Sequence, residues 1–127
     1  MTDGRRRLGA FGERLAAAHL EAKGYRIRAR NYRCREGEID IVAQDGETLV
    51  FVEVRTRRGD ALGGPAESIT ATKEARLVTA AMSYVQALPQ PPADQRIDVI
   101  AIQLSPGGRL LAIDHIEGAV SQREPLR

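Results

Sequence analysis

The spacing of apolar residues predicts two helices in this chain. Within residues 7–22, apolar positions recur at intervals of three and four, which places them on one helix face. These positions are Leu8, Phe11, Leu15, Ala18 and Ala22. Residues 70–88 repeat the pattern and end at a proline-rich segment, as a helix does. We therefore expect one helix over 7–22 and a second over 70–88.

Shorter apolar runs predict the strands. Residues 25–32 alternate small or apolar residues with basic ones, a pattern typical of a half-exposed strand. The remaining strands are expected over residues 38–44, 48–57, 97–102 and 109–116. The run 97–102 is almost entirely apolar and is therefore expected at the centre of the sheet. The order α-β-β-β-α-β-β predicts an α/β fold, a central mixed sheet flanked by two helices.

Length and composition favour one globular domain. The 127 residues are 43% hydrophobic and 28% charged, which excludes disorder of the whole chain. We expect a core over about 7–116, a loop over 58–67 and a polar tail over 117–127. No apolar run is long enough to cross a membrane. Because Cys34 is the single cysteine, an internal disulfide and a multi-cysteine zinc site are excluded, and a cytoplasmic location fits best.

The basic residues lie mainly in the first half of the chain. Six basic residues and no acidic one occur from Lys23 to Arg35. Such clustering is typical of proteins that bind a polyanion such as nucleic acid. A solvated basic face explains the charge alone equally well.

Charged residues inside two apolar strands are the most informative chemistry. Glu38 and Asp40 interrupt the second strand, and Glu53 and Arg55 interrupt the third. A carboxylate in a buried strand is costly unless it is paired, protonated or bound to a metal ion. These residues therefore require a partner.

A hairpin between the second and third strands would bring these charges together. If residues 45–46 form its two-residue loop, Glu38 lies opposite Glu53, and Asp40 projects from the same face. Like charges opposite each other are destabilising, so we expect a hard cation such as Mg²⁺ or Mn²⁺ there. An ordinary ion-pair network that joins Glu53, Arg55 and one strand carboxylate is the structural alternative.

The same two strands resemble the PD-(D/E)XK nuclease motif. Asp40 matches its Asp, and Glu53-Val54-Arg55 matches its Glu-x-Lys with arginine in place of lysine. Further blocks resemble the YraN family of small bacterial proteins. These blocks are Gly12-Glu13, Gly24-Tyr25, residues 30–33, 37–42 and 51–55, Lys73 with Arg76, and residues 96–100. This resemblance implies a restriction-endonuclease-like fold, similar to archaeal Holliday-junction resolvases.

The resemblance also implies a metal-dependent phosphodiesterase, an endonuclease that acts on branched or structured DNA. Asp40 and Glu53 would hold Mg²⁺ or Mn²⁺, and Glu13 and Glu38 are further candidate ligands. A solvated charge at the edge of the first helix is the alternative for Glu13. The arginines expected to grip the nucleic-acid backbone are Arg26, Arg28, Arg30, Arg33, Arg57 and Arg58.

The arginine at position 55 leaves two functional readings open. Arg55 cannot act as a general base because it stays protonated, but it can stabilise phosphate charge. Lys73 is a candidate for a migrated catalytic lysine, with a phosphate contact or a surface charge as alternatives. A catalytically degenerate nucleic-acid-binding module, acting with a helicase or recombination partner, is the second functional hypothesis. The resolvase likeness makes a two-fold homodimer an expectation as well.

Overall fold

The computed structural model of the chain describes residues 2–59 and 71–120. Its elements follow the expected order and form an α/β fold with two helices and five strands. They are α1 (Thr2–Ala22), β1 (Arg26–Cys34), β2 (Gly37–Asp45), β3 (Thr48–Arg58), α2 (Ala71–Gln86), β4 (Asp94–Leu104) and β5 (Leu110–Val120). Most of the loop expected over 58–67 lies outside the described residues.

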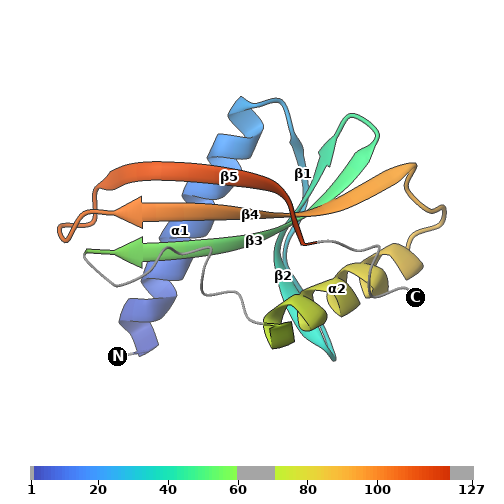
Figure 1. Cartoon of the computed structure of the whole chain (residues 1–127), viewed down its shortest axis with the longest axis horizontal. Helices are drawn as coiled ribbons and strands as arrows, with labels where there is room; N and C mark the ends of the chain where they lie inside the picture. The colour runs from blue at the N-terminus through green and yellow to red at the C-terminus, as the bar shows by residue number, and fades with distance from the viewer. Residues whose placement is uncertain (1, 60–70, 121–127) are drawn as a thin grey trace.

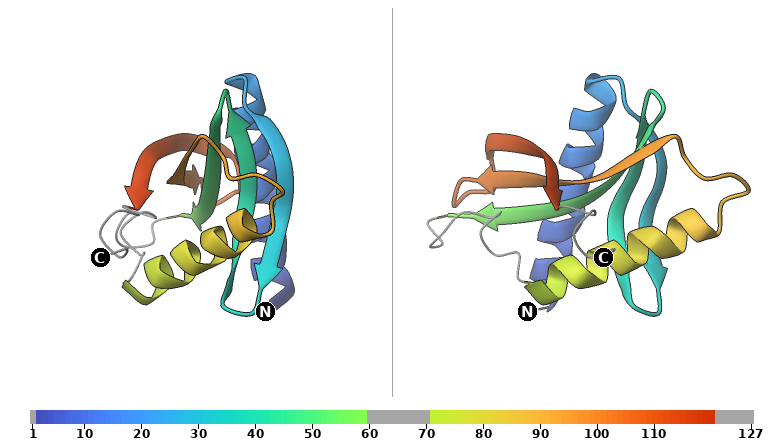
Figure 2. Two further views of the ribbon diagram at one scale, coloured as in Figure 1. Left: turned by 90° about the vertical axis from the view of Figure 1, so that its right-hand side faces the viewer. Right: turned by 45° about the vertical axis from the view of Figure 1, so that its right-hand side comes forward.

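The strands form one mixed sheet in the order β1-β2-β3-β4-β5. Only β3 and β4 run parallel, and α2 belongs to the connection between them; the other neighbouring strands are antiparallel. The two helices cover opposite faces of the sheet (Figure 1, Figure 2). Among the described residues, neither helix is long and apolar enough to cross a membrane.

Alternation along the strands divides the core into two layers. Ile41 and Val52 pack with α1 on one face, whereas Val42 and Phe51 pack with α2 on the other. All four side chains are fully buried. Successive residues of a strand point to opposite faces, so continuous apolar runs are required where helices cover both. This explains why β2, β3 and β4 are the most apolar strands.

Close packing at one glycine fixes α1 against the sheet. A Cβ at Gly12 would collide with Oγ1 of Thr56 on β3. The missing side chain therefore allows the helix backbone to approach the strand closely. The next residue, Glu13, is carried toward the sheet by this contact.

The hairpin between β2 and β3 differs from the expected one. Asp45 pairs with Thr48, so the two loop residues are Gly46 and Glu47 and not Asp45 and Gly46. Gly46 has φ of 61° and stands first in the loop, where a type II′ turn requires glycine. The register moves by two residues as a result. The prediction that Glu38 lies opposite Glu53 was therefore wrong.

A hydrogen bond between β5 and a side chain of β4 explains why β5 runs four residues past its expected end at residue 116. The pairing of β4 with β5 shifts between Ile97 and Val99, and Gly118 has φ of 62°. The N–H of Gly118 donates to Oδ1 of Asp98 at 2.9 Å. A side chain of β4 therefore bonds the irregular backbone and keeps β5 on the sheet to Val120.

Candidate functional site

Strands β2 and β3 separate from each other in the middle of the sheet. Their hydrogen-bonded ladder runs from Asp45↔Thr48 to Ile41↔Val52 and ends there. Beyond that point β2 continues only with β1, and β3 continues only with β4. The two arms diverge in Figure 1 and in the right view of Figure 2. We call this point, with Asp40 on one arm and Glu53 on the other, the fork.

The carboxylate of Asp40 joins the two arms of the fork. Its Oδ2 accepts a hydrogen bond from the backbone N–H of Val54 at 2.8 Å. A side chain thus takes the place of a backbone acceptor in the ladder, and the N–H of Val54 stays satisfied. Asp40 is only 9% exposed. The fork therefore fixes a buried carboxylate beside the start of the diverging β3 arm.

The electrostatic surroundings of Asp40 are unfavourable for its charge. Burial, and then the negative charge of Glu53, raise the pKa of Asp40 to about 8. The charges of Glu13 and Glu38 contribute to this rise, whereas the hydrogen bond from the Val54 N–H opposes it. All the predicted metal ligands therefore lie within electrostatic reach of Asp40. Without a cation at this place, the structure favours the protonated acid near neutral pH.

Glu53 is buried as well but has a cation beside it. Nη1 of Arg55 donates to Oε2 of Glu53 at 3.0 Å, and both side chains are largely buried. Burial raises the pKa of Glu53, and the charges of Arg55 and Lys73 oppose that rise. The structure therefore brings Arg55 into contact with Glu53 and places Lys73 close to the pair.

A cleft of about 550 Å³ opens between the diverging arms and the start of α2. Glu53 and Arg55 line it from β3, and Lys73 lines it from α2. Asp40 is not part of the lining because its side chain is buried at the fork. The other described lining residues are Arg33, Cys34, Arg35, Glu36, Gly37, Glu38, Arg76 and Leu77. Five of the lining residues are basic and three are acidic, so the cleft combines carboxylates with a surplus of cations.

Glu13 and Glu38 flank the fork and are held by arginines of β1. Glu13, 17% exposed at its side chain, lies 4.0 Å from Arg30, so it faces the sheet and is not a solvated charge. Glu38 pairs with Arg33 at 3.3 Å at the surface. Within residues 2–59 and 71–120, no group of three or more potential ligands is already arranged around one point. A metal bound here would need water or phosphate oxygens to complete its ligands, as Mg²⁺ commonly does.

The structure spreads the six predicted backbone-binding arginines along the molecule. Arg33 lines the cleft, whereas Arg28 donates to Gln44 at 2.8 Å beside a second cleft near the β2–β3 loop. Arg26 is exposed on the same edge strand, β1. Arg57 and Arg58 end β3 at the other end of the sheet, where Arg58 donates to the carbonyl of Pro106 at 2.8 Å. These arginines cannot all meet one short ligand.

Sequence reasoning missed several cleft residues, of which Arg76 is the clearest. Arg76 lies three residues after Lys73 on α2, and this spacing places both on one helix face. Its backbone carbonyl would lie 3.2 Å from a Cβ at Gly37, so α2 and the β1–β2 turn pack closely. The helical spacing was a usable signal. No comparable signal indicated Arg35 and Glu36, because their place at the cleft depends on where the β1–β2 hairpin ends in space.

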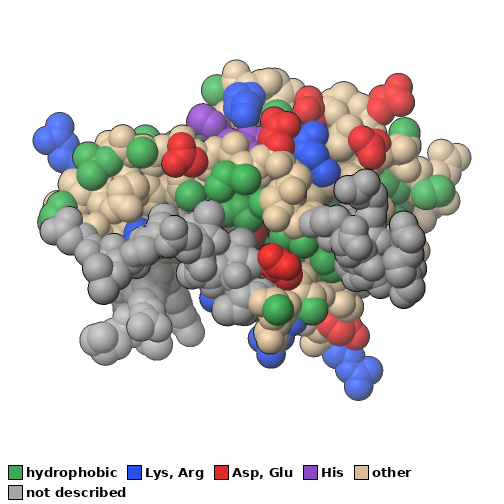
Figure 3. All heavy atoms as spheres, in the orientation of Figure 1, with side chains coloured by type: hydrophobic (Ala, Val, Ile, Leu, Met, Phe, Trp, Pro, Cys, Tyr) green, Lys and Arg blue, Asp and Glu red, His purple; other side chains and the backbone are tan. Residues whose placement is uncertain are grey.

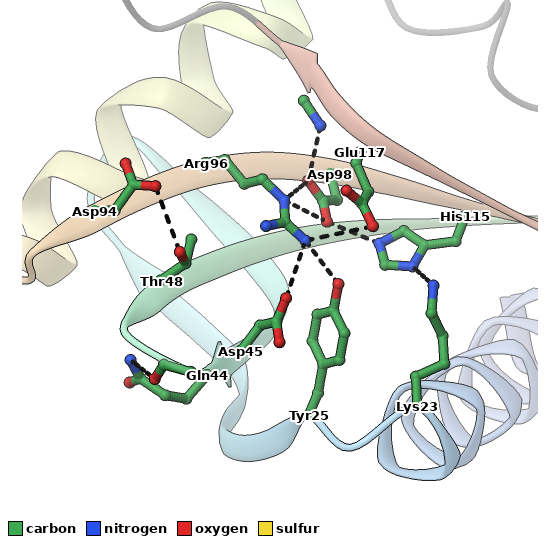
Figure 4. A network of polar contacts seen from close by, with 12 residues as sticks. Lys23, Tyr25, Gln44, Asp45, Thr48, Asp94, Arg96, Asp98, His115 and Glu117 are labelled. Atoms are coloured by element: carbon green, nitrogen blue, oxygen red, sulfur yellow. Dashed lines mark hydrogen bonds and ion pairs between the residues drawn. The ribbon is translucent and has the colours of Figure 1, made fainter.

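A separate polar network lies between β4, β5 and the end of α1 (Figure 4). Asp98 is fully buried and accepts hydrogen bonds from Arg96 at 3.0 Å and Gly118 at 2.9 Å. His115 Nε2 lies 2.7 Å from Asp98, and His115 Nδ1 lies 2.7 Å from Nζ of Lys23. An ammonium can only donate, so His115 accepts through Nδ1 and donates through Nε2. The network therefore ties three elements together.

Comparison with known proteins places the chain in a family. The model of the uncharacterised protein family UPF0102 matches residues 12–102. A UPF0102 protein of Symbiobacterium thermophilum is 52% identical over 105 residues, covering 83% of this chain and 89% of that protein. One from Chloroflexus aurantiacus is 50% identical and covers 93% and 96%, and one from Chlorobaculum tepidum is 50% identical and covers 88% and 90%. The matched region contains the fork and α2. The chain belongs to the uncharacterised protein family UPF0102, the YraN family that its motifs resemble.

Proposed function

We propose that this protein is a divalent-metal-dependent phosphodiesterase acting on nucleic acid, with a nuclease-like fold. The observation that carries the proposal is the fork, where the buried Asp40 and the partly buried Glu53 lie beside a cleft rich in cations. Carboxylates beside a site for an anionic substrate are unfavourable unless a cation lies between them. A binding protein for a polyanion has no need of such a pair.

The donor set at the fork fits Mg²⁺ or Mn²⁺. Asp40 and Glu53 offer hard carboxylate oxygens and are the residues that would hold the ion, and the negative charges of Glu13 and Glu38 add to the field at Asp40. Burial and mutual repulsion of these acids favour neutralisation by a cation. When bound, the ion would supply a Lewis acid for a phosphoryl oxygen.

The cations of the cleft bind and orient the phosphodiester. The guanidinium of Arg55 places a planar donor set beside Glu53, suited to non-bridging phosphate oxygens. Lys73 and Arg76 approach from α2 on the other side of the cleft. These groups stabilise negative charge that develops on the phosphate, a role that does not require a general base.

The substrate we propose is DNA with branched or otherwise exposed strands. This rests on the nuclease motif and on the arginines that run from β1 to the end of β3. Contacts between arginine side chains and phosphates bind the nucleic-acid backbone without reading the base sequence. A helicase or recombination protein is the partner class that would deliver such a substrate.

A binding module without efficient catalysis is the second candidate. The observation that favours it is the engagement of Arg55 with Glu53 at 3.0 Å, in the position where the nuclease motif has lysine. In such a module, the ion pair would neutralise Glu53 and leave the cleft to hold phosphate.

Cleavage assays decide between the two candidates. Labelled four-way junction, flap, single-stranded and duplex DNA would be incubated with Mn²⁺, Mg²⁺ or EDTA. Glu53→Gln is the test variant. Glu47→Gln is the matched control, because Glu47 is exposed in the loop of the same hairpin. We expect metal-dependent cleavage by the wild type and Glu47→Gln, and a loss of about 100-fold or more in Glu53→Gln.

Each result has a distinct meaning. Salt-sensitive binding without cleavage in any metal would favour the binding module. Equal cleavage by Glu53→Gln and the wild type would show that Glu53 is not part of the active site. Absence of both cleavage and binding would contradict the nucleic-acid function altogether.

A further inference from the structure

Within the part of the chain that the structure describes, strand β5 forms one open edge of the sheet. It is the last strand in the order β1-β2-β3-β4-β5 and spans eleven residues, Leu110–Val120. In Figure 2 its outer side carries no neighbouring strand. An edge strand of this length presents backbone N–H and C=O groups that can pair with another strand.

Exposed apolar side chains are concentrated on the same strand. Among the described residues, the large hydrophobic side chains that are exposed are Leu110, Leu111, Ile116 and Met82, and the first three belong to β5. Leu111 is 63% exposed. Figure 3 shows hydrophobic side chains at the surface over this part of the sheet. An apolar group on an unpaired edge is typical of a protein–protein contact.

The other edge of the sheet is protected by charge. The edge strand β1 carries four arginines, and arginine or lysine on an edge discourages strand pairing. Strand β5 has neither, and its charged residues are the two acids Asp114 and Glu117. The two edges therefore differ in the property that controls edge-to-edge association.

We propose that β5 pairs antiparallel with β5 of a second copy of this chain. The result is a two-fold dimer with one continuous sheet. Two identical edges related by a two-fold axis satisfy each other and leave no β5 open. The proposal rests on the edge alone and does not depend on the proposed function.

Charge and shape place the two-fold axis near Ile113. With the axis there, Ile113 lies opposite Ile113 of the second copy. Leu111 is two residues away on the same face of the strand, the face on which Ile113 packs toward α1. Moving the axis by one residue to Asp114 would put two carboxylates directly opposite each other, which is destabilising. Moving it to Ala112 would place Asp114 against Leu110 and shorten the paired segment.

Pairing of β5 with β1 of another copy is the competing arrangement. It would match the acids of β5 with arginines, but several of these arginines already have partners in their own chain. Arg30 lies 4.0 Å from Glu13, and Arg33 lies 3.3 Å from Glu38. Such a contact would also leave one edge open at each end and continue into a filament.

The molecular mass in solution tests the dimer. Analytical ultracentrifugation across the micromolar range would compare the wild type with Leu111→Lys and with Met82→Lys. Leu111 and Met82 are both exposed, so lysine is tolerated by the fold at either position, and only Leu111 lies on β5. We expect a dimer for the wild type and Met82→Lys. For Leu111→Lys we expect weaker association, with the Kd of the dimer raised at least about tenfold.

Cross-linking tests the register. In a Cys34→Ser background, Ile113→Cys would be treated with a short bifunctional thiol reagent, with Ala87→Cys after the end of α2 as the control. We expect covalent dimer at position 113 only. A monomeric wild type, an undisturbed dimer in Leu111→Lys, or no cross-link at position 113 would each overturn the proposal. Growth into larger species with concentration would overturn it in favour of β5–β1 pairing.

Discussion

At the scale of single residues, two contacts act on Asp40 in opposite directions. The N–H of Val54 stabilises its carboxylate, whereas burial and the charge of Glu53 destabilise it. The second influence is stronger, since the pKa rises to about 8. Asp40 thus lowers the stability of the metal-free protein whenever it is ionised. Such a cost is typical of residues that are retained for a ligand.

The pH dependence of unfolding follows from that shift. The folded pKa of Asp40 lies above the unfolded value of 3.8, so its stabilising contribution is complete below about pH 4 and is lost as the pH rises toward 8. Asp40→Asn keeps an acceptor for the Val54 N–H and cannot ionise. At pH 8 in EDTA we expect the variant to unfold at a higher urea concentration than the wild type. Its free energy of unfolding should be higher by on the order of 2 kcal/mol.

Controls separate this effect from a general one. Glu47→Gln changes an exposed acid in the adjoining β2–β3 loop and is expected to leave the pH profile of stability unchanged. Adding Mn²⁺ at pH 8 should stabilise the wild type and not Asp40→Asn, because binding to the folded state alone adds stability. A variant no more stable than the wild type at pH 8 would contradict the assigned environment of Asp40.

At the scale of elements, the order of helices and strands could be predicted because each follows from apolar periodicity. The fork could not. The segments Ile39-Asp40-Ile41 and Ile97-Asp98-Val99 read alike in the sequence, with one aspartate between apolar neighbours. Asp40 lies where two strands part, whereas Asp98 lies beneath His115 and Gly118. Their different roles come from the neighbouring strands, which the local pattern does not specify.

Asp98 therefore behaves oppositely to Asp40. Burial acts to raise the pKa of Asp98, but hydrogen bonds from His115, Gly118 and Arg96 outweigh it and hold the pKa below its usual value. Its stabilising contribution is present above the unfolded pKa of 3.8 and is lost as the pH falls through the lower folded pKa. We expect Asp98→Asn to lower the free energy of unfolding at pH 7 by about 3 kcal/mol.

Chemical unfolding of matched variants checks this expectation. Asp94→Asn, at the exposed start of the same strand, serves as the control and should change stability by less than about 0.5 kcal/mol. The deficit of Asp98→Asn should shrink below pH 4, where the wild-type carboxylate also takes up a proton. Equal stability of both variants at pH 7 would show that the network does not hold β5 to the sheet.

At the scale of the whole molecule, basic side chains surround the fork on several elements. Arg33 and Arg35 approach from the β1–β2 hairpin, Arg55 from β3, and Lys73 and Arg76 from α2. Charge clustering between Lys23 and Arg35 indicated a basic segment, and Arg33 was among the candidates, whereas Arg35 was not. The contribution of α2 depends on the parallel crossover from β3 to β4, which carries that helix back across the sheet. The overall surplus of cations at the cleft is therefore a property of the topology.

The salt dependence of DNA binding measures how many of these cations meet phosphate. Each phosphate contact on a single strand contributes about 0.7 to the slope of log Kd against log salt concentration. Arg76→Gln should weaken binding of a labelled oligonucleotide and reduce this slope by about 0.7. Arg14→Gln is the control, because Arg14 is an exposed arginine of α1 that does not line the cleft. Equal slopes for all three proteins would show that DNA binds elsewhere, and the arginines along β1 would then be the surface to vary next.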